Sequence, residues 1–163
     1  MVNEAVSDTG PIIHLTEINL LKAFNIFSKL TIPYEVEKEL QRYKVAVPSN
    51  VKIKKLTDGS KDKVKILTNQ YDLNLGEAAA ISLTLQKKAD YFLTDDLDAR
   101  QVAKEYNLKV HGSIGIIMRA FRNKIISKDQ AIEKIKELKV KSSLFITQDL
   151  INEAIEAINK FSK

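Results

Sequence analysis

The sequence predicts an α/β fold in which helices cover both faces of a parallel central sheet. Short apolar runs alternate along the chain with stretches of helical periodicity, an order that is typical of repeated strand–helix units. The chain has 163 residues, 44% of them hydrophobic, with only five glycines and three prolines. This length and composition fit one globular domain with a sizeable core.

Five short segments are expected to form the strands of this sheet. Four are apolar runs, and the third along the chain alternates apolar residues with lysine, as a half-exposed edge strand does. In folds of this class ligands bind at the carboxyl ends of the strands, so the residues after each strand are the first candidates for a site. The expected strands span 4–7, 30–32, 51–56, 91–93 and 108–110.

Helices are expected between and after the strands. Thr9 or Gly10 is expected to cap the first helix, with Pro11 in its first turn, and Ser127 with Gln130 forms a capping-box pattern. Three further caps are expected at Ser60, Ser113 and Thr147. The expected helices span 11–27 with a break near residue 19, 33–43, 60–71, 75–87, 97–106, 113–123, a stretch that begins near 127, and 147–161.

The composition limits the classes of protein and partner. The chain has no cysteine, which excludes disulfides and thiolate metal sites, and no apolar stretch approaches the roughly 18 residues of a membrane span. No basic segment followed by an apolar run marks a signal peptide, so a soluble, cytoplasmic protein without membrane contact is expected. The net charge of +5 makes nucleic acid a reasonable partner.

Acidic residues stand where several of the expected elements begin or end. They are Asp8, Glu39, Glu77, Asp95, Asp96 and Asp98. Carboxylates gathered from distant parts of a chain repel one another, and a fold tolerates them when a hard cation neutralises their charge. The pattern therefore indicates a divalent-metal site. Asp96 and Asp98 are expected to share a metal or a water, whereas Asp95 is expected to be structural.

Each acid also has a purely structural explanation. Asp8 and one aspartate of the 95–98 group fit helix N-caps, and Glu77 lies in a first helical turn, where a carboxylate is favoured by about 0.3–1 kcal/mol. Glu39 lies at the edge of the apolar arc of its helix, so it either points inward or extends along the surface, while Glu35 and Glu37 are expected toward solvent. The joint occurrence of these acids favours the metal site.

The other chemistry-bearing residues are expected to be mainly structural. His14 lies in an apolar helix and is expected to pack there, and two histidines without cysteine argue against zinc. Arg100, one turn into a helix, is structural, or it pairs with an acid or a phosphate. The lysine-rich segments 52–65 and 119–141 are solvated faces, or they hold an RNA backbone. No phosphate-binding glycine loop is present.

Five segments of the chain resemble the PIN domain, a family of metal-dependent nucleases that includes the VapC-type toxins of toxin–antitoxin pairs. They extend over about residues 5–125 and read VSDTGPII, IPYEVEKEL, LGEAAAISL, YFLTDDLDAR and VHGSIGII. The likeness is greatest to a subgroup with GEA at the third acid and DD at the fourth. It implies a three-layer α/β/α fold with a PIN-like nuclease domain over 1–125. Residues 126–163 would be a C-terminal helical extension packed on that domain or on a partner.

The resemblance also implies roles for individual residues. PIN domains gather four acids around Mg²⁺ or Mn²⁺, and the matching catalytic acids and metal ligands here are Asp8, Glu39, Glu77 and Asp96, with Asp98 as a further ligand. The supporting residues are expected to be Thr9, Thr94, Asp95 and Arg100. The chain departs from common family residues at Gly10, Glu77 and Ala99, which leaves fine geometry and substrate choice open.

The implied function is metal-dependent endoribonuclease activity, exerted by a toxin that has an antitoxin partner. In such a reaction water attacks the phosphorus in line while cations stabilise the transition state. One alternative is a catalytically inactive PIN-like module that binds RNA or protein, and another is a metal-dependent phosphatase on a different α/β fold. A homodimer or higher oligomer is also expected, unless the helix at 147–161 folds back on the core.

Overall fold

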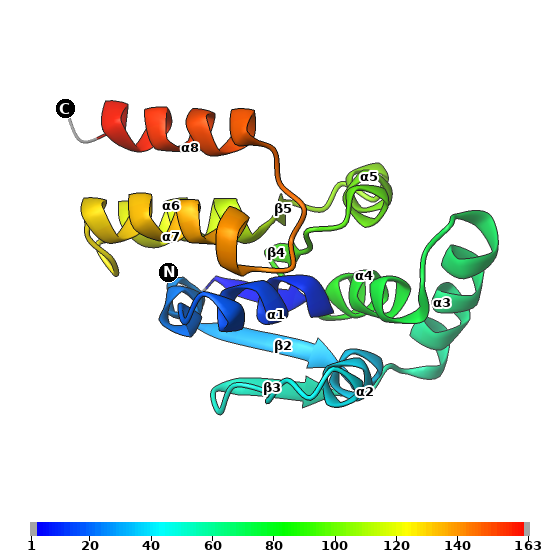
Figure 1. Ribbon diagram of the computed structural model, residues 1–163. Coiled ribbons are helices and arrows are strands. Elements are labelled where there is room, and N and C mark those ends of the chain that lie inside the picture. Colours follow the sequence, from blue (N-terminus) through cyan, green and yellow to red (C-terminus); the bar gives the residue numbers. More distant parts are fainter. Residues whose placement is uncertain (1–2, 162–163) are drawn as a thin grey trace.

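The structure, a computed structural model that describes residues 3–161, is built on a five-stranded sheet (Figure 1). The strands are β1 (Glu4–Ser7), β2 (Lys29–Pro33), β3 (Val51–Lys54), β4 (Tyr91–Leu93) and β5 (Val110–His111). Their order is β3-β2-β1-β4-β5, and every neighbouring pair is parallel. The predicted parallel sheet is confirmed. β3 lies at one edge, where Lys52 and Lys54 are exposed and discourage pairing with another chain.

The order of the strands creates a crevice beside β1. The chain winds from β1 outward to β2 and β3, then returns past β1 to β4 and β5. The connections that follow β1 and β4 therefore leave on opposite faces of the sheet, and a crevice opens at the carboxyl ends of these two strands. The last residues of β1 and β4, Ser7 and Leu93, are paired in register. Asp8 and Thr94, which come next, consequently emerge side by side.

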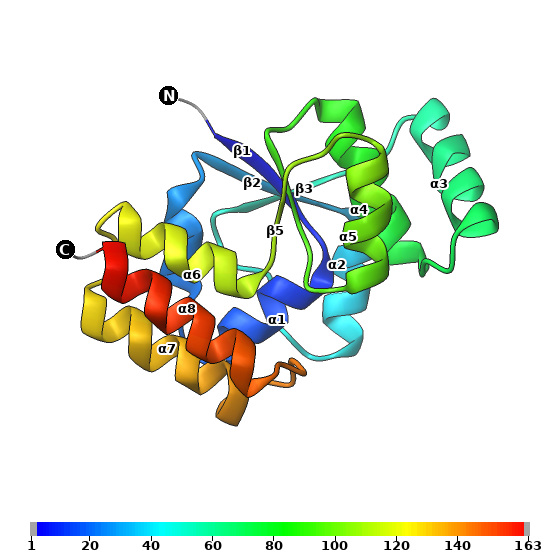
Figure 2. The same ribbon diagram turned by 90° about the horizontal axis from the view of Figure 1, so that it is seen from above.

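Helices form a layer on each face of the sheet and complete the predicted three-layer α/β/α fold (Figure 2). α4 and α5 lie on one face with α3 outside α4, whereas α1 and α6 lie on the other with α7 and α8 outside α6. Within residues 3–161, no helix is long and apolar enough to cross a membrane. The helices are α1 (Thr9–Glu17), the 3-10 helix η1 (Leu21–Ile26), α2 (Tyr34–Arg42), α3 (Asp58–Gln70), α4 (Leu75–Lys87), α5 (Leu97–Glu105), α6 (Ser113–Arg122), α7 (Lys128–Lys141) and α8 (Gln148–Phe161).

Small side chains let α4 lie directly on the sheet. Gly76 and the three alanines at 78–80 are buried, and the helix contacts β1, β2 and β4. Without bulky side chains in between, a helix backbone can approach a neighbouring element closely and still pack densely. This approach brings the first turn of α4 to the carboxyl ends of the central strands.

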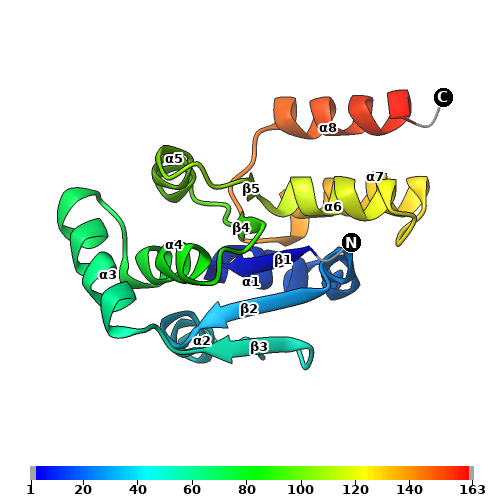
Figure 3. The same ribbon diagram turned by 180° about the vertical axis from the view of Figure 1, so that it is seen from behind.

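The C-terminal helices are tied to the rest of the chain through α1 and α6. α8 lies outermost, over α6 and α7, in both side views (Figures 1 and 3). The Lys134 ammonium donates a hydrogen bond to the Ile18 carbonyl at 2.7 Å and pairs with Glu137 at 2.9 Å. Ser143 donates its backbone N–H and its hydroxyl to Glu17, both at 2.8 Å. The division of the chain at residue 125 stays a prediction.

Several predicted helix starts are wrong in detail. The first helix is capped by the Asp8 side chain instead of Thr9 or Gly10, and α3 is capped by Thr57, three residues before Ser60. Gly112 occupies the cap position of α6, so Ser113 is its first residue and its hydroxyl has another use. The capping box at Ser127 and the break near residue 19 are confirmed, because Asn19 takes a left-handed conformation between α1 and η1.

We predict that α7 stabilises the domain through its buried face. Ile135 is fully buried, whereas Val140 on the same helix is 80% exposed. Ile135→Ala should lower the free energy of unfolding by about 2–5 kcal/mol, because it leaves a cavity against α6 and α8. Val140→Ala should change it by less than about 0.5 kcal/mol. Urea denaturation of both variants measures this, and equal effects would contradict the observed packing.

Candidate active site

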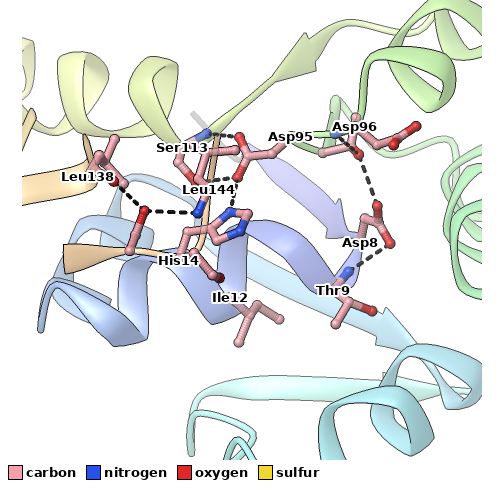
Figure 4. A network of polar contacts seen from close by, with 12 residues as sticks. Asp8, Thr9, Ile12, His14, Asp95, Asp96, Ser113, Leu138 and Leu144 are labelled. Atoms are coloured by element: carbon pink, nitrogen blue, oxygen red, sulfur yellow. Dashed lines mark hydrogen bonds and ion pairs between the residues drawn. The ribbon is translucent and has the colours of Figure 1, made fainter. Parts of the chain in front are cut away.

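Asp8 is held at the junction of β1 and α1 by hydrogen bonds from both sides. Its Oδ1 accepts the Thr9 backbone N–H at 2.7 Å, and its Oδ2 accepts the Thr94 hydroxyl at 2.9 Å (Figure 4). Its own backbone N–H donates to the Leu93 carbonyl at 2.8 Å, which continues the pairing of β1 with β4. The residue is 5% exposed, so a carboxylate is buried at the floor of the crevice.

Asp96 is placed by the same threonine and by the start of α5. It is the N-cap of α5, and its Oδ2 accepts the Ala99 backbone N–H at 2.8 Å. The Asp96 backbone N–H donates to the Thr94 hydroxyl oxygen at 3.1 Å. The Thr94 hydroxyl therefore links Asp8 to the backbone of Asp96. The supporting role expected for Thr94 stays a prediction.

Glu77 and Glu39 approach from the other side of the crevice. Glu77 and Asn74 form a capping box at the start of α4, in which each side chain accepts the other's backbone N–H at 2.8 Å. Glu39 lies half-buried on α2, and a Cβ on Gly76 would collide with its Oε2. Glu39 thus points inward over the first turn of α4, which decides the alternative left open by the sequence. Glu35, expected toward solvent, is also half-buried, and its Oε1 is inaccessible.

The structural and functional explanations of these acids are not alternatives. Asp8, Glu77 and Asp96 each accept backbone N–H groups in the first turn of a different helix, namely α1, α4 and α5. The positive ends of three helices therefore converge where the acids gather, and each end favours a carboxylate. One oxygen of Glu77 and one of Asp96 are used in capping, and a hydrogen bond between the two side chains contributes to the raised pKa of Glu77.

The gathered charge remains uncompensated. Burial raises the pKa of Asp8 to about 6, and the charges of Glu39 and Asp96 add to the effect against the hydrogen bonds from Thr9 and Thr94. Burial raises the pKa of Glu77 to about 8, and the charges of Asp8 and Asp96 raise it further against the hydrogen bond from Asn74. None of these four acids forms an ion pair with a lysine, arginine or histidine in the described part of the chain.

The donor set fits a hard divalent cation in its chemistry. Mg²⁺ and Mn²⁺ prefer carboxylate and hydroxyl oxygens. The buried Thr9 hydroxyl, beside Asp8, has no hydrogen-bond partner within residues 3–161 and adds an oxygen without a structural use. As they lie, however, the acids and histidines of these residues include no group of three close enough to hold a metal. Asp98 is exposed, and its charge does not contribute to the raised pKa of Asp8 or Glu77.

Asp95 points away from the other acids and fixes the turn that carries Asp96. Its Oδ1 accepts the Ser113 backbone N–H at 2.6 Å, and its Oδ2 accepts the Ser113 hydroxyl at 2.5 Å (Figure 4). His14 Nδ1 donates to the same Oδ2 at 2.6 Å, although only packing was expected of it. A Cβ on Gly112 would collide with Oδ1, so glycine is needed for α6 to reach this carboxylate. Asp95 thus joins the β4–α5 turn to α1 and α6.

Arg100 neither pairs with an acid nor projects freely toward solvent. It is half-buried, and its Nη2 lies 3.5 Å from the Thr94 carbonyl as a weak donor. Its Nε is inaccessible and has no partner among the described residues. The contact with Thr94 favours the structural explanation of Arg100 over the phosphate contact.

Some of the residues that shape this site were absent from the expected set. They are His14, Asn74, Gly76, Gly112 and Ser113. Asn74 had a visible signal, because Asn-x-x-Glu before an alanine-rich helix is a capping-box pattern. The others had none, since their partners are far away in the sequence.

A parallel α/β domain with carboxylates at its switch point has a candidate site where such folds bind ligands, and comparisons with known proteins identify its family. The family model DUF3368, a PIN domain, matches residues 4–160, so this chain belongs to the PIN domain family. PIN domains are generally nucleases that bind divalent metals. The phosphatase hypothesis, which required a different fold, is therefore wrong. Membership of the GEA and DD subgroup stays a prediction.

A solved structure shows the same fold. The chain is similar to a PilT N-terminus domain protein from the hyperthermophilic archaeon Sulfolobus solfataricus P2, with 17% identity and a TM-score of 0.54. The likeness covers 69% of this chain and 89% of that one. No curated protein sequence matches this chain significantly.

We predict that the metal-free protein loses stability as the pH rises. The pKa of Asp8 in the folded protein is about 6, against an ordinary value of 3.8. The contribution of Asp8 to the free energy of unfolding is therefore fully present below about pH 4 and is lost as the pH rises through 6. For Asp8 this loss of stability is on the order of 2–3 kcal/mol. Because the pKa of Glu77 is raised to about 8, the pH range over which stability is lost extends toward pH 8.

Thermal melts in EDTA measure this effect. Asp8→Asn should melt above the wild type by a margin that widens from pH 5 to pH 8, while the exposed control Asp62→Asn should follow the wild type. Mn²⁺ should raise the melting temperature of the wild type and leave that of Asp8→Asn unchanged. A margin that does not depend on pH would contradict the raised pKa of Asp8.

We predict that His14 supports the site through Asp95. His14→Leu removes a donor to a buried carboxylate and should cost about 1–3 kcal/mol of stability and roughly 10-fold in Mn²⁺ affinity. His14→Asn keeps an N–H near the position of Nδ1 and should restore most of both. Urea denaturation and calorimetric titration measure the pair, and wild-type Mn²⁺ affinity in His14→Leu would show that Ser113 alone holds the turn.

Proposed function

We propose that this protein is a metal-dependent endoribonuclease that hydrolyses RNA phosphodiester bonds in the cytoplasm as the toxin of a toxin–antitoxin pair. The observation that carries the proposal is the set of four acids without a compensating cation at the switch point of a PIN fold. A stable protein keeps such a charge when its function requires a cation there.

The acids would differ in their roles in metal binding according to how each is held in place. Asp8 and Asp96, which are fixed by Thr94 and by helix N-termini, would hold Mg²⁺ or Mn²⁺. Glu77 and Glu39 would complete the ligand set from α4 and α2, and exposed Asp98 would contribute only through water. When bound, the cations lower the barrier by stabilising charge on the phosphoryl group. Because the pKa of Glu77 is raised to about 8, metal binding near neutral pH should release a proton.

The reaction proposed is a direct displacement without a covalent enzyme intermediate. The oxygen of water forms a bond to phosphorus as the bond from phosphorus to the leaving sugar oxygen breaks. Water gives up a proton, and the leaving oxygen takes one up. No nucleophilic side chain is required, and the buried carboxylates are available to accept the proton of the water.

The basic surfaces that would attract RNA differ from one another in availability. In the segment 52–65 the lysines of β3 are exposed. In the segment 119–141, Lys134 is bound to Ile18 and Glu137, and Lys139 donates to Gln148 at 3.0 Å. These two side chains are less able to serve as phosphate contacts than the sequence suggested.

A protein partner, which the toxin role requires, would find apolar surface near the site. A hollow of about 490 Å³ between α5, α6 and the start of α8 includes the exposed side chains of Leu97, Phe145 and Leu150. Burial of such side chains drives protein association. We propose this hollow as the contact for an antitoxin or for a second copy of the chain.

The test of the proposed function is cleavage of RNA under controlled metal conditions. Single-stranded RNA should be cut internally with Mn²⁺ or Mg²⁺ and spared in EDTA. Asp96→Asn should lower the rate on the order of 100-fold or more, because it removes an anchored negative ligand, whereas Asp62→Asn on α3 should cut as the wild type does.

The same assay decides the alternative function. Equal residual cutting by the wild type and by Asp96→Asn would indicate contamination. The inactive RNA- or protein-binding module would then be the better explanation.

A further inference from the structure

Two of the four gathered acids, Asp8 and Glu39, line surface hollows that adjoin each other. One hollow, of about 910 Å³, runs along the exposed side of α2 and the start of α4. The other, of about 470 Å³, runs along α1 and contains Asp8. Glu39, Tyr43 and Asn74 line both, so the two hollows form one groove that passes Asp8 and Glu39 and continues on either side.

Tyr43 stands at the junction of the two hollows with its ring free. It ends α2, one helical turn of about 5.4 Å beyond Glu39, and 63% of it is exposed. Its side chain has no hydrogen bond or ring contact within residues 3–161. Lys44 has a positive φ of 57°, so the backbone turns directly after Tyr43, whose side chain lines both hollows. An exposed aromatic ring without an internal contact is available for stacking.

Cations line the α2 side of the groove. Lys38 and Arg42 are exposed in the larger hollow, and neither is paired with a carboxylate in the described residues. The Lys38 ammonium lies 5.2 Å from the centre of the Tyr34 ring, which is itself partly exposed. The remaining acid of this hollow, Glu35, keeps its Oε1 inaccessible. The outer wall is thus cationic and aromatic, whereas the floor is acidic.

We propose that this groove binds a single nucleic-acid strand, with an unpaired base beside the acids stacked on Tyr43 and with the adjacent phosphates at Arg42 and Lys38. The assignment rests on the nuclease function proposed above and adds the side chains that would bind the strand. Bases of a duplex are stacked on one another and cannot reach a side-chain ring, so the groove selects unpaired segments. Because the groove continues past the acids in both directions, internal bonds reach them without a free end.

Binding in EDTA tests the groove separately from cleavage. Fluorescence anisotropy of a labelled single-stranded RNA 12-mer, the same sequence as DNA, and the RNA duplex should show that both single strands bind more tightly than the duplex. Tyr43→Ala should weaken single-strand binding by roughly 10-fold, whereas Tyr43→Phe keeps the ring and should stay within about twofold. Both substitutions are at an exposed position, and thermal melts should confirm that the variants are folded.

A charge-matched pair of variants tests the cationic wall. Lys38→Gln with Arg42→Gln should weaken binding of every single strand alike and reduce its dependence on salt, because fewer counterions are released. The control is Lys104→Gln with Lys109→Gln, at the opposite edge of the sheet, where two exposed charges are also lost. Equal effects of the two double variants would show that only net charge matters and would overturn the assignment.

The outcomes separate this inference from the proposed function. If single-stranded nucleic acids bind through Tyr43 but are not cut with Mn²⁺, the groove assignment is supported and the proposed ribonuclease function is contradicted. If Tyr43→Ala cuts RNA at the wild-type rate with unchanged KM, the proposed ribonuclease function is supported and the groove assignment is contradicted. Duplex binding as tight as single-strand binding would also overturn the groove assignment. The same holds if no nucleic acid binds and the groove instead binds a protein that covers Tyr43.

Discussion

The structure depends on carboxylates that accept backbone N–H groups at the starts of helices. Asp8, Glu77, Asp96 and Asp95 do so for α1, α4, α5 and α6, respectively. Each contact satisfies a donor that the helix itself leaves unpaired, and the helix dipole offsets part of the cost of burying a charge. The first three carboxylates face one crevice. Burial raises the pKa values of Asp8 and Glu77 there, and the repulsion between the carboxylates raises them further.

Close backbone approach and one hydroxyl hold this arrangement together. The crevice exists because the winding of the sheet reverses between β1 and β4, and the Thr94 hydroxyl fixes the residues that follow these strands relative to each other. Glycines at 76 and 112 let two helix starts approach the carboxylates of Glu39 and Asp95. The acids are therefore positioned by rigid elements, which is what a preorganised site requires.

The charges of the site are arranged in two zones. Buried Asp8 and half-buried Glu39 lie in the floor, and exposed cations and tyrosines of α2 form a wall beside it. Under the proposed function this separation has a physical use, because the wall attracts a polyanion while the floor keeps its affinity for a divalent cation. A cationic side chain among the acids would relieve their repulsion and remove the reason to bind metal.

Features that depend on neighbours in the chain can be predicted from the sequence. Periodicity predicted the strands and helices, and the placement of Asp8, Glu77 and Asp96 at element ends predicted where carboxylates would meet. The tertiary structure alone decided the strand order, the inward direction of Glu39 and the contact of His14 with Asp95, 81 residues away. It also decided that Ser113 binds Asp95 instead of capping α6, and that Lys134 binds the carbonyl of Ile18. A cap is a local contact that its own segment encodes, whereas these partners become neighbours only when distant segments pack together.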